Sequence, residues 1–62
     1  MIPAPYQIYE NAEGEHFVLL KLQLAATGTW LALAVKPALH LVMLSQFNLD
    51  RMHYLGRASL KS

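Results

Sequence analysis

The stretch FVLLKLQLAATGTWLALAVK, residues 17–36, decides the predicted fold because it contains two runs in which apolar residues recur at every second position. A period of two is typical of a β-strand with one buried face. Gly28 lies between the runs and can adopt the positive φ that a short hairpin connection often needs. The sequence therefore predicts a β-hairpin, with a buried face made of Val18, Leu20, Leu22, Leu24, Leu31, Leu33 and Val35.

The residues before the hairpin predict a third strand. The segment YQIYE at 6–10 is rich in β-prone tyrosine and isoleucine, and the tetrapeptide 11–14, with Asn first and Gly last, fits a type I turn. Pro3 and Pro5 are tolerated only on an edge strand or its approach. We therefore expect a three-stranded antiparallel meander over residues 6–36, with the long second strand in the centre.

The residues after the hairpin predict helix. Pro37 suits a first helical turn, where its missing N–H has no helical partner. Leu39, Val42, Met43 and Phe47 form a stripe at helical spacing that would close over the leucine face of the sheet. Asn48 could cap a second short turn that ends before Gly56, so the segment 37–55 is one bent helix or two.

These elements predict an α+β fold in a single small domain. Its expected parts are an N-terminal arm (1–5), the meander (6–36), the helical segment (37–55) and a flexible basic tail (56–62). A chain of 62 residues buries only about 60% of the surface that its unfolded form exposes. Because the chain has no cysteine, disulfides cannot compensate, and a partner is the remaining common source of stability.

The expected fold leaves apolar side chains uncovered. The outer face of the hairpin would carry Phe17, Leu19 and Trp30, and the sides of the helix would carry Leu41 and Leu44. Monomeric proteins rarely expose contiguous apolar patches above a few hundred Å². We therefore predict an interface in a homodimer, or with a larger protein, that consists of Phe17, Leu19, Trp30, Met43 and Leu44.

No catalytic or cofactor motif is found. The sequence lacks cysteine, a nucleophile elbow around serine and a glycine-rich phosphate loop. Glu13, Glu15 and His16 fit a solvated turn, and Asp50 with His53 supplies only two of the three protein ligands of a catalytic zinc site. The basic residues near the C-terminus, Arg51, Arg57 and Lys61, are too few in one chain for the phosphate contacts that dominate nucleic-acid binding, so this function ranks third and would need a dimer to double them. We expect neither an enzyme nor a bound cofactor or metal.

The expected function is that of a small, non-enzymatic interaction module: a regulator, inhibitor or accessory subunit. The lack of cysteine fits a reducing compartment such as the cytoplasm. The alternative is a single-pass subunit of a membrane complex, with a helix through about residues 17–35 or beyond. Lys21 and Lys36 interrupt that apolar run, which makes it short for a spanning helix.

Overall fold

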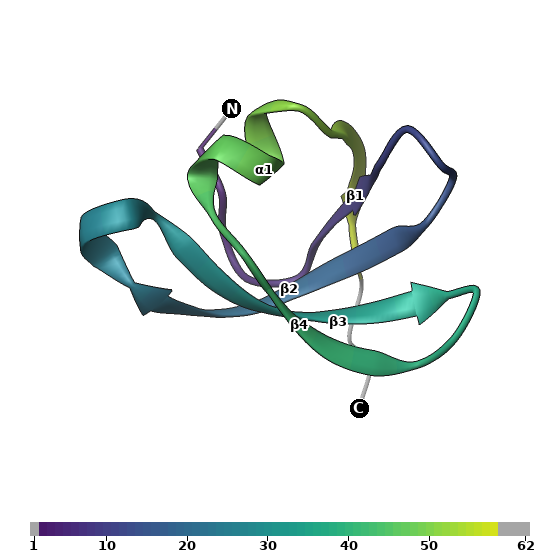
Figure 1. Cartoon of the computed structure of the whole chain (residues 1–62), viewed down its shortest axis with the longest axis horizontal. Coiled ribbons are helices and arrows are strands. Elements are labelled where there is room, and N and C mark those ends of the chain that lie inside the picture. The colour runs from purple at the N-terminus through teal and green to yellow at the C-terminus, as the bar shows by residue number, and fades with distance from the viewer. Residues whose placement is uncertain (1, 59–62) are drawn as a thin grey trace.

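The computed structural model describes residues 2–58, which form a five-stranded antiparallel sheet in the order β4-β3-β2-β1-β5 (Figure 1). The elements are β1 (Gln7–Glu10), β2 (His16–Leu24), the 3-10 turn η1 (Ala25–Thr27), β3 (Thr29–Lys36), β4 (His40–Leu44), helix α1 (Gln46–Asp50) and β5 (His53–Arg57). The first four strands follow one another as neighbours, and β5 returns to pair with β1. The predicted α+β fold is therefore wrong: the described chain is mostly β.

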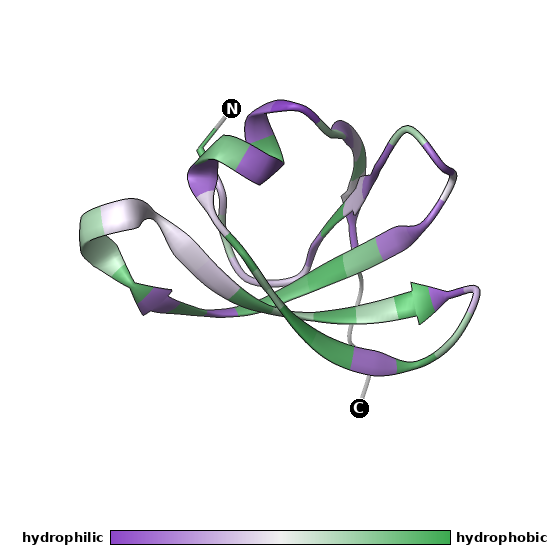
Figure 2. Cartoon of the chain, viewed as in Figure 1, coloured by the Kyte–Doolittle hydropathy of each residue, from purple (hydrophilic) through white to green (hydrophobic). Residues whose placement is uncertain are grey.

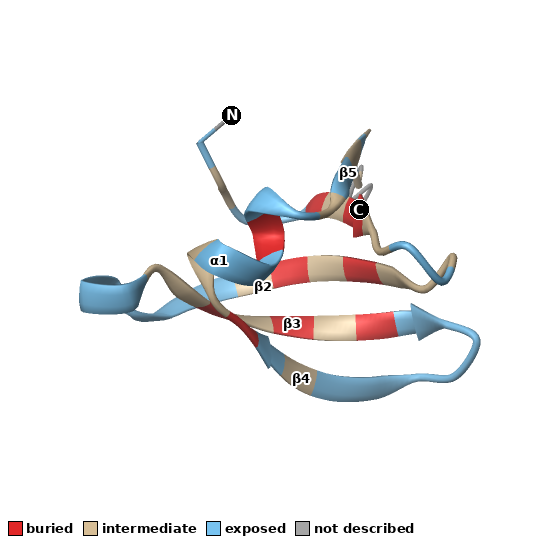
Figure 3. Cartoon of the chain, turned by 45° about the horizontal axis from the view of Figure 1, so that its top comes forward, coloured by how far each residue is buried: buried red, intermediate tan, exposed pale blue. Residues whose placement is uncertain are grey.

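One face of the sheet is covered and the other is not. Figure 3 shows α1 lying over one side of the sheet, near β2 and β3. Leu49 is the buried residue of α1, and it joins the hydrophobic core. The other core members come from β1 to β4: Tyr9, Phe17, Leu19, Trp30, Ala32, Ala34 and Leu44. We call this covered side the inner face and the opposite side the outer face.

The turn between β1 and β2 is organised by Asn11. Its Oδ1 accepts hydrogen bonds from the backbone N–H groups of Glu13 (3.0 Å) and Glu15 (2.9 Å), and its Nδ2 donates to the carboxylate of Glu15 (2.6 Å). Gly14 has φ of 82°, a conformation that glycine adopts without a steric penalty. The predicted turn at 11–14 is therefore present, with Asn11 at its first position and Gly14 at its last.

The β2–β3 hairpin depends on Gly28, which caps η1 in the left-handed region at φ 61°. A Cβ at this position would lie 2.9 Å from Cβ of Gln46 in α1. Glycine is therefore needed here for two reasons: the sign of φ and the close approach of the helix. The strands on either side, β2 and β3, lie where the sequence predicts them.

The predicted helical segment over 37–55 is wrong for most of its length. A turn with a cis peptide bond between Lys36 and Pro37 leads into β4, which pairs with β3. The run LVML at 41–44 is apolar at every position, so it satisfies the helical period and the strand period equally. The backbone of β3, which would otherwise lack a partner on this side, decides between them.

The helix that does form is short, and its start differs from the expected one. The Ser45 hydroxyl accepts a hydrogen bond from the backbone N–H of Asn48 (3.2 Å), and the Asn48 side chain accepts one from the backbone N–H of Ser45 (3.0 Å). This reciprocal pair is a capping box. Asn48 therefore lies in the first turn of α1 instead of capping a second helix.

The sequence assigned the two faces of the hairpin the wrong way round. Phe17 and Leu19 lie on the inner face with Trp30 and the alanines of β3, whereas Val18 and Leu33 lie opposite each other on the outer face. Residues directly opposite on antiparallel strands share a face. A β-bulge between Leu19 and Lys21 then shifts the alternation. Leu22 consequently pairs with Trp30 on the inner side, although the regular pattern had grouped it with Val18.

Two further expectations concern residues 17–35 and the C-terminus. In the described part of the chain, no helix is long and apolar enough to cross a membrane, and residues 17–35 contribute to β2 and β3. Of the expected flexible tail, Gly56 and Arg57 belong to β5, and residues 59–62 lie outside the described residues.

Candidate interaction surface

The outer face carries a continuous apolar row that crosses four strands. Ile8 in β1 lies opposite Val18 in β2, and Val18 in turn lies opposite Leu33 in β3. Leu33 lies opposite Leu41 in the edge strand β4. Neighbouring side chains in such a row are about 4.5–5.5 Å apart at Cβ, so they form one surface. The row is partly shielded in its middle and most open at Leu41, which is 61% exposed.

A second row lies beside the first, toward the β2–β3 turn. It consists of Lys21, Leu31 and Met43, which are opposite one another across β2, β3 and β4. Met43 is 49% exposed. Figure 2 shows that β3 and β4 are hydrophobic over most of their length. We define the outer patch as the apolar members of the two rows: Ile8, Val18, Leu31, Leu33, Leu41 and Met43.

The patch reaches a free edge of the sheet at β4. An edge strand presents backbone N–H and C=O groups on its open side, and proteins commonly protect such an edge with lysine, proline or a bulge. The sequence of β4, HLVML, contains neither lysine nor proline, and its register with β3 is regular. The edge is therefore open to contact, and it is continuous with the outer patch.

The structure separates the five residues of the predicted interface. Phe17, Leu19, Trp30 and Leu44 are buried in the core, whereas Met43 is in the outer patch. An interface role for the five stays a prediction. In the folded monomer, however, only Met43 offers substantial surface to another molecule. Leu31 and Leu33, which the sequence prediction placed on the buried face of the hairpin, belong to the outer patch instead.

A polar network crosses the inner side near β1. The Tyr9 hydroxyl donates a hydrogen bond to Oε1 of the buried Gln7 (2.7 Å), which also accepts one from the backbone N–H of Ala4 (3.0 Å). Gln7 Nε2 donates to the Ile2 carbonyl (3.2 Å). These bonds hold residues 2–4 against β1, so the expected N-terminal arm is tied to the sheet.

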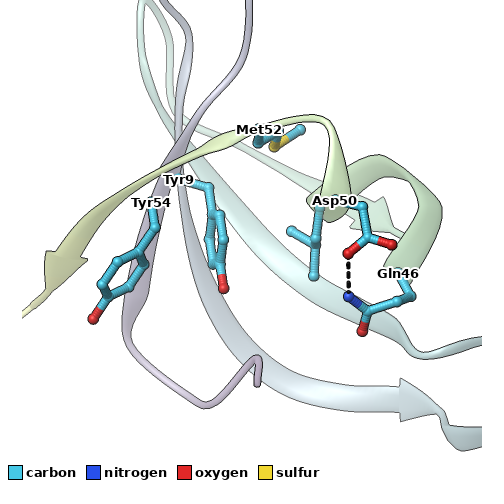
Figure 4. A pocket seen from close by; sticks show the side chains of 6 residues that line it. Tyr9, Gln46, Asp50, Met52 and Tyr54 are labelled. Atoms are coloured by element: carbon cyan, nitrogen blue, oxygen red, sulfur yellow. Dashed lines mark hydrogen bonds between the residues drawn. The ribbon is translucent and has the colours of Figure 1, made fainter. Parts of the chain in front are cut away.

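A pocket of about 180 Å³ opens between β1, β5 and α1. Figure 4 shows the rings of Tyr9 and Tyr54 side by side across from Gln46 and Asp50 of α1. The two ring centroids are 5.6 Å apart with planes inclined at 59°. Burial, and then the nearby Tyr54 and Asp50, raise the pKa of Tyr9 above its ordinary value. The burial of Tyr9 and the nearby carboxylate of Asp50 therefore both disfavour ionisation of the Tyr9 phenol.

The acidic and histidine residues singled out from the sequence are dispersed. Glu13 and Glu15 lie in the β1–β2 turn. His16, which the sequence groups with them, has its Nε2 3.1 Å from the carboxylate of Glu10. Asp50 is in α1, and His53 is in β5. Within residues 2–58, no group of three or more His, Asp or Glu side chains is placed to hold a metal ion.

Comparisons with known proteins give no relative: no family model, no curated protein and no solved structure matches the chain. Function is therefore inferred from the surface of the protein itself. Sequence patterns did not predict the outer patch, although one signal for it was present. Trp30, Ala32 and Ala34 alternate on one face of β3, and a face with a large aromatic and two small residues can lie directly under a covering helix. If this face is the covered one, Leu31 and Leu33 must lie on the opposite, outer face.

Proposed function

We propose that the protein is a small, non-enzymatic interaction module that self-associates through the outer patch. The observation that carries the proposal is the apolar row Ile8–Val18–Leu33–Leu41, which runs across four strands on the face away from the core. Such a patch is typical of a protein–protein contact surface. Two sheets that pack face to face lie about 10 Å apart, with their side chains interdigitated.

The charge distribution supports a second copy as the occupant. Residues 1–20 contain three carboxylates and no lysine or arginine, whereas residues 21–62 contain all five basic residues and one aspartate. On the outer face, Glu10 is the last residue of β1 and lies opposite His16 at the start of β2, whereas Lys21 lies on the other side of the apolar row. A two-fold axis between the faces and perpendicular to the strands brings Lys21 of each copy over the Glu10 end of the other.

The apolar rows and the charged residues contribute different amounts of binding free energy. Complete burial of a leucine-sized side chain contributes about 1.5–3 kcal/mol, whereas an exposed ion pair contributes about 0–1 kcal/mol. The apolar rows therefore supply most of the affinity, and the charges fix the relative orientation of the copies. A larger protein with an apolar sheet face is the alternative occupant.

Analytical ultracentrifugation over a concentration series tests the proposal. We expect the wild-type chain to form a dimer, and Leu41→Lys to raise the dissociation constant at least about tenfold. Phe47→Lys is the matched control, because Phe47 is exposed to a similar degree but lies on α1, above the inner face. A wild-type chain that stays monomeric, or an equal effect of the control, would contradict self-association through the outer patch.

A charge-swap experiment tests the orientation of the two copies. Lys21→Glu and Glu10→Lys should each weaken the dimer, and the double variant should restore it because the inter-copy pairs are re-formed with opposite signs. Added salt should reduce both effects. If the double variant dimerises more weakly than either single variant, the two-fold arrangement that pairs Lys21 with Glu10 of the other copy is excluded. Self-association through the outer patch would not be contradicted by that result.

A further inference from the structure

We infer that β4 pairs edge to edge with β4 of a second copy, so that the two sheets join into one continuous antiparallel sheet. Within residues 2–58, β4 is the last strand on its side of the sheet and pairs with β3 alone. Figure 3 shows β4 along one border of the sheet, exposed over most of its length. This contact lies in the plane of the sheet, so it is separate from the face-to-face contact of the outer patch.

The direction of the backbone groups in β4 can be traced from a hydrogen bond on the other side of the sheet. The Leu19 carbonyl accepts a hydrogen bond from the backbone N–H of Tyr6 (2.7 Å), so the backbone groups of Leu19 point toward β1. In an antiparallel sheet, successive residues of a strand point their N–H and C=O groups to opposite neighbours. Val18 therefore points toward β3, and its partner Leu33 points back toward β2.

The same alternation, continued through β3, assigns the groups at the open edge. Ala32 follows Leu33 in the alternation, so its backbone groups point toward Val42 in β4. The register of β3 with β4 is regular, so Leu41 and Met43, on either side of Val42, point their N–H and C=O groups away from β3. The open edge therefore presents the backbone donors and acceptors of these two residues.

The open edge of β4 is complementary to itself. A two-fold axis at Val42 places Leu41 of each copy opposite Met43 of the other. Because these are the residues whose backbone groups point outward, each opposed pair exchanges two N–H···O=C bonds. Val42 then lies opposite Val42 of the other copy, and cross-strand contact between branched side chains is favourable. The strand contains no lysine, arginine, aspartate or glutamate, so no such like charges meet at its centre.

The outer patch continues across this junction, which favours a second copy as the occupant. The row that ends at Leu41 continues into Met43 and Leu31 of the other copy, and the row that ends at Met43 continues into Leu41 and Leu33 of the other copy. The two outer patches thus become one apolar surface. A strand of an unrelated protein would form the backbone bonds but need not continue the apolar rows.

The opposite edge of the sheet, β5, lacks these properties. Its pairing with β1 shifts register between Ile8 and Tyr9, Gly56 has φ of 130°, and the strand ends at Arg57. Bulges and charged residues are common means of protecting a sheet edge. Pairing of β4 with β4 uses the regular edge of both copies and closes at two chains, whereas pairing of β4 with β5 would be open-ended.

Amide hydrogen exchange of the full chain, observed by NMR over a concentration series, tests the inference. In the monomer, the N–H groups of Leu41 and Met43 should exchange rapidly, whereas the N–H of Val42, which points to β3, should be protected. At high concentration, we expect exchange at Leu41 and Met43 to slow by at least about tenfold. Face-to-face packing through the outer patch leaves these N–H groups at the open edge and does not produce this change.

Variants separate the edge contact from the outer patch. Met43→Pro removes an outward N–H and places the proline ring at the edge, a position where a strand tolerates proline. Met43→Ala is the matched control, because it also shortens the side chain but keeps the N–H. Concentration-dependent protection at Leu41 should be lost in Met43→Pro and persist in Met43→Ala. It should also persist in Lys21→Glu, which weakens the face-to-face contact, so the two proposals can fail separately.

Four results would overturn the inference. Exchange at Leu41 and Met43 that is equally fast at every concentration would exclude a second copy and leave the edge to a strand of another protein. Protection at the lowest concentration would show that these N–H groups do not point outward. Protection that disappears in Lys21→Glu, or that is the same in Met43→Pro and Met43→Ala, would arise from the outer patch. If circular dichroism shows that Met43→Pro does not fold, the wild-type and Lys21→Glu measurements still decide.

Discussion

Replacing Leu19 by alanine tests which face of the sheet is the core. Leu19 is 0% exposed, and it lies opposite Ala32 in β3, which leaves no large neighbour at that position to fill the space. Truncation of a buried leucine removes the transfer free energy of its methyl groups and leaves a cavity, at a total cost of about 2–5 kcal/mol. A domain of this length has a total stability of roughly 3–9 kcal/mol, so the loss is a large part of the whole.

Leu41→Ala is the matched control, because the same change is made at a leucine of the outer face that is 61% exposed. At concentrations low enough for a monomer, we expect this variant to lose less than about 0.5 kcal/mol. Urea denaturation, followed by the fluorescence of Trp30, measures the loss of unfolding free energy in Leu19→Ala and in Leu41→Ala. If Leu19→Ala does not fold, Leu19→Met replaces it in the comparison, with an expected cost of less than about 1.5 kcal/mol. A loss from Leu41→Ala equal to or greater than that from Leu19→Ala would refute the assignment of faces.

Three other predictions concern turns, the helix cap and alkaline pH. Gly28→Ala should lower the free energy of unfolding by more than the roughly 1–2 kcal/mol of left-handed strain, because the new Cβ also meets α1. Gly14→Ala is the control, since its Cβ would meet nothing within 4 Å. Urea denaturation that shows an equal loss of stability in both variants would refute the close approach of α1 to Gly28. Ser45→Ala removes the cap of α1 and should cost about 0.5–2 kcal/mol by thermal denaturation, whereas Ser45→Asp should retain most of it. The pKa of Tyr9 is raised by burial and by neighbouring negative groups, so its contribution to stability is complete below pH 10 and is lost as pH rises through the folded-state pKa. Tyr9→Phe should therefore lose less stability than the wild type between neutral and strongly alkaline pH, and an unchanged slope would contradict the role of this phenol.

The strands and turns that rest on local patterns could be predicted from the sequence. The strand Thr29–Lys36 lies within the second alternating run of residues 17–36, after Gly28, and the turn at 11–14 uses Asn and Gly as expected. Both depend on side-chain alternation and on φ preferences that a few neighbouring residues determine. The information needed is therefore contained in the segment itself.

The sequence predictions failed where contacts between residues distant in sequence determine the secondary structure or the buried face. The 41–44 run is apolar at every position, so only its pairing with β3 makes it a strand. Both faces of the hairpin are apolar as well, and the choice of the inner face depends on Leu49 of α1 covering Trp30 and the small alanines of β3. The bulge after Leu19 then moves Leu22 away from the face that a regular alternation assigns to it.

The outer patch and the pocket could not be found from patterns along the chain. The outer patch becomes visible only when the register of four strands is known, since Ile8 and Leu41 meet in one row through Val18 and Leu33. The pocket joins Tyr9 and Tyr54, which are far apart in sequence and are brought into contact by the pairing of β1 with β5.

The most direct test of self-association through the outer patch is an isotope-filtered NOE experiment on a mixture of labelled and unlabelled chains. The methyl groups of Leu41 and Met43 should show NOEs between copies, and those of Leu19, which is buried in each monomer, should show none. Inter-copy NOEs confined to other surfaces, such as α1 around Phe47, or none at a concentration where the chain sediments as a dimer, would contradict the proposed contact.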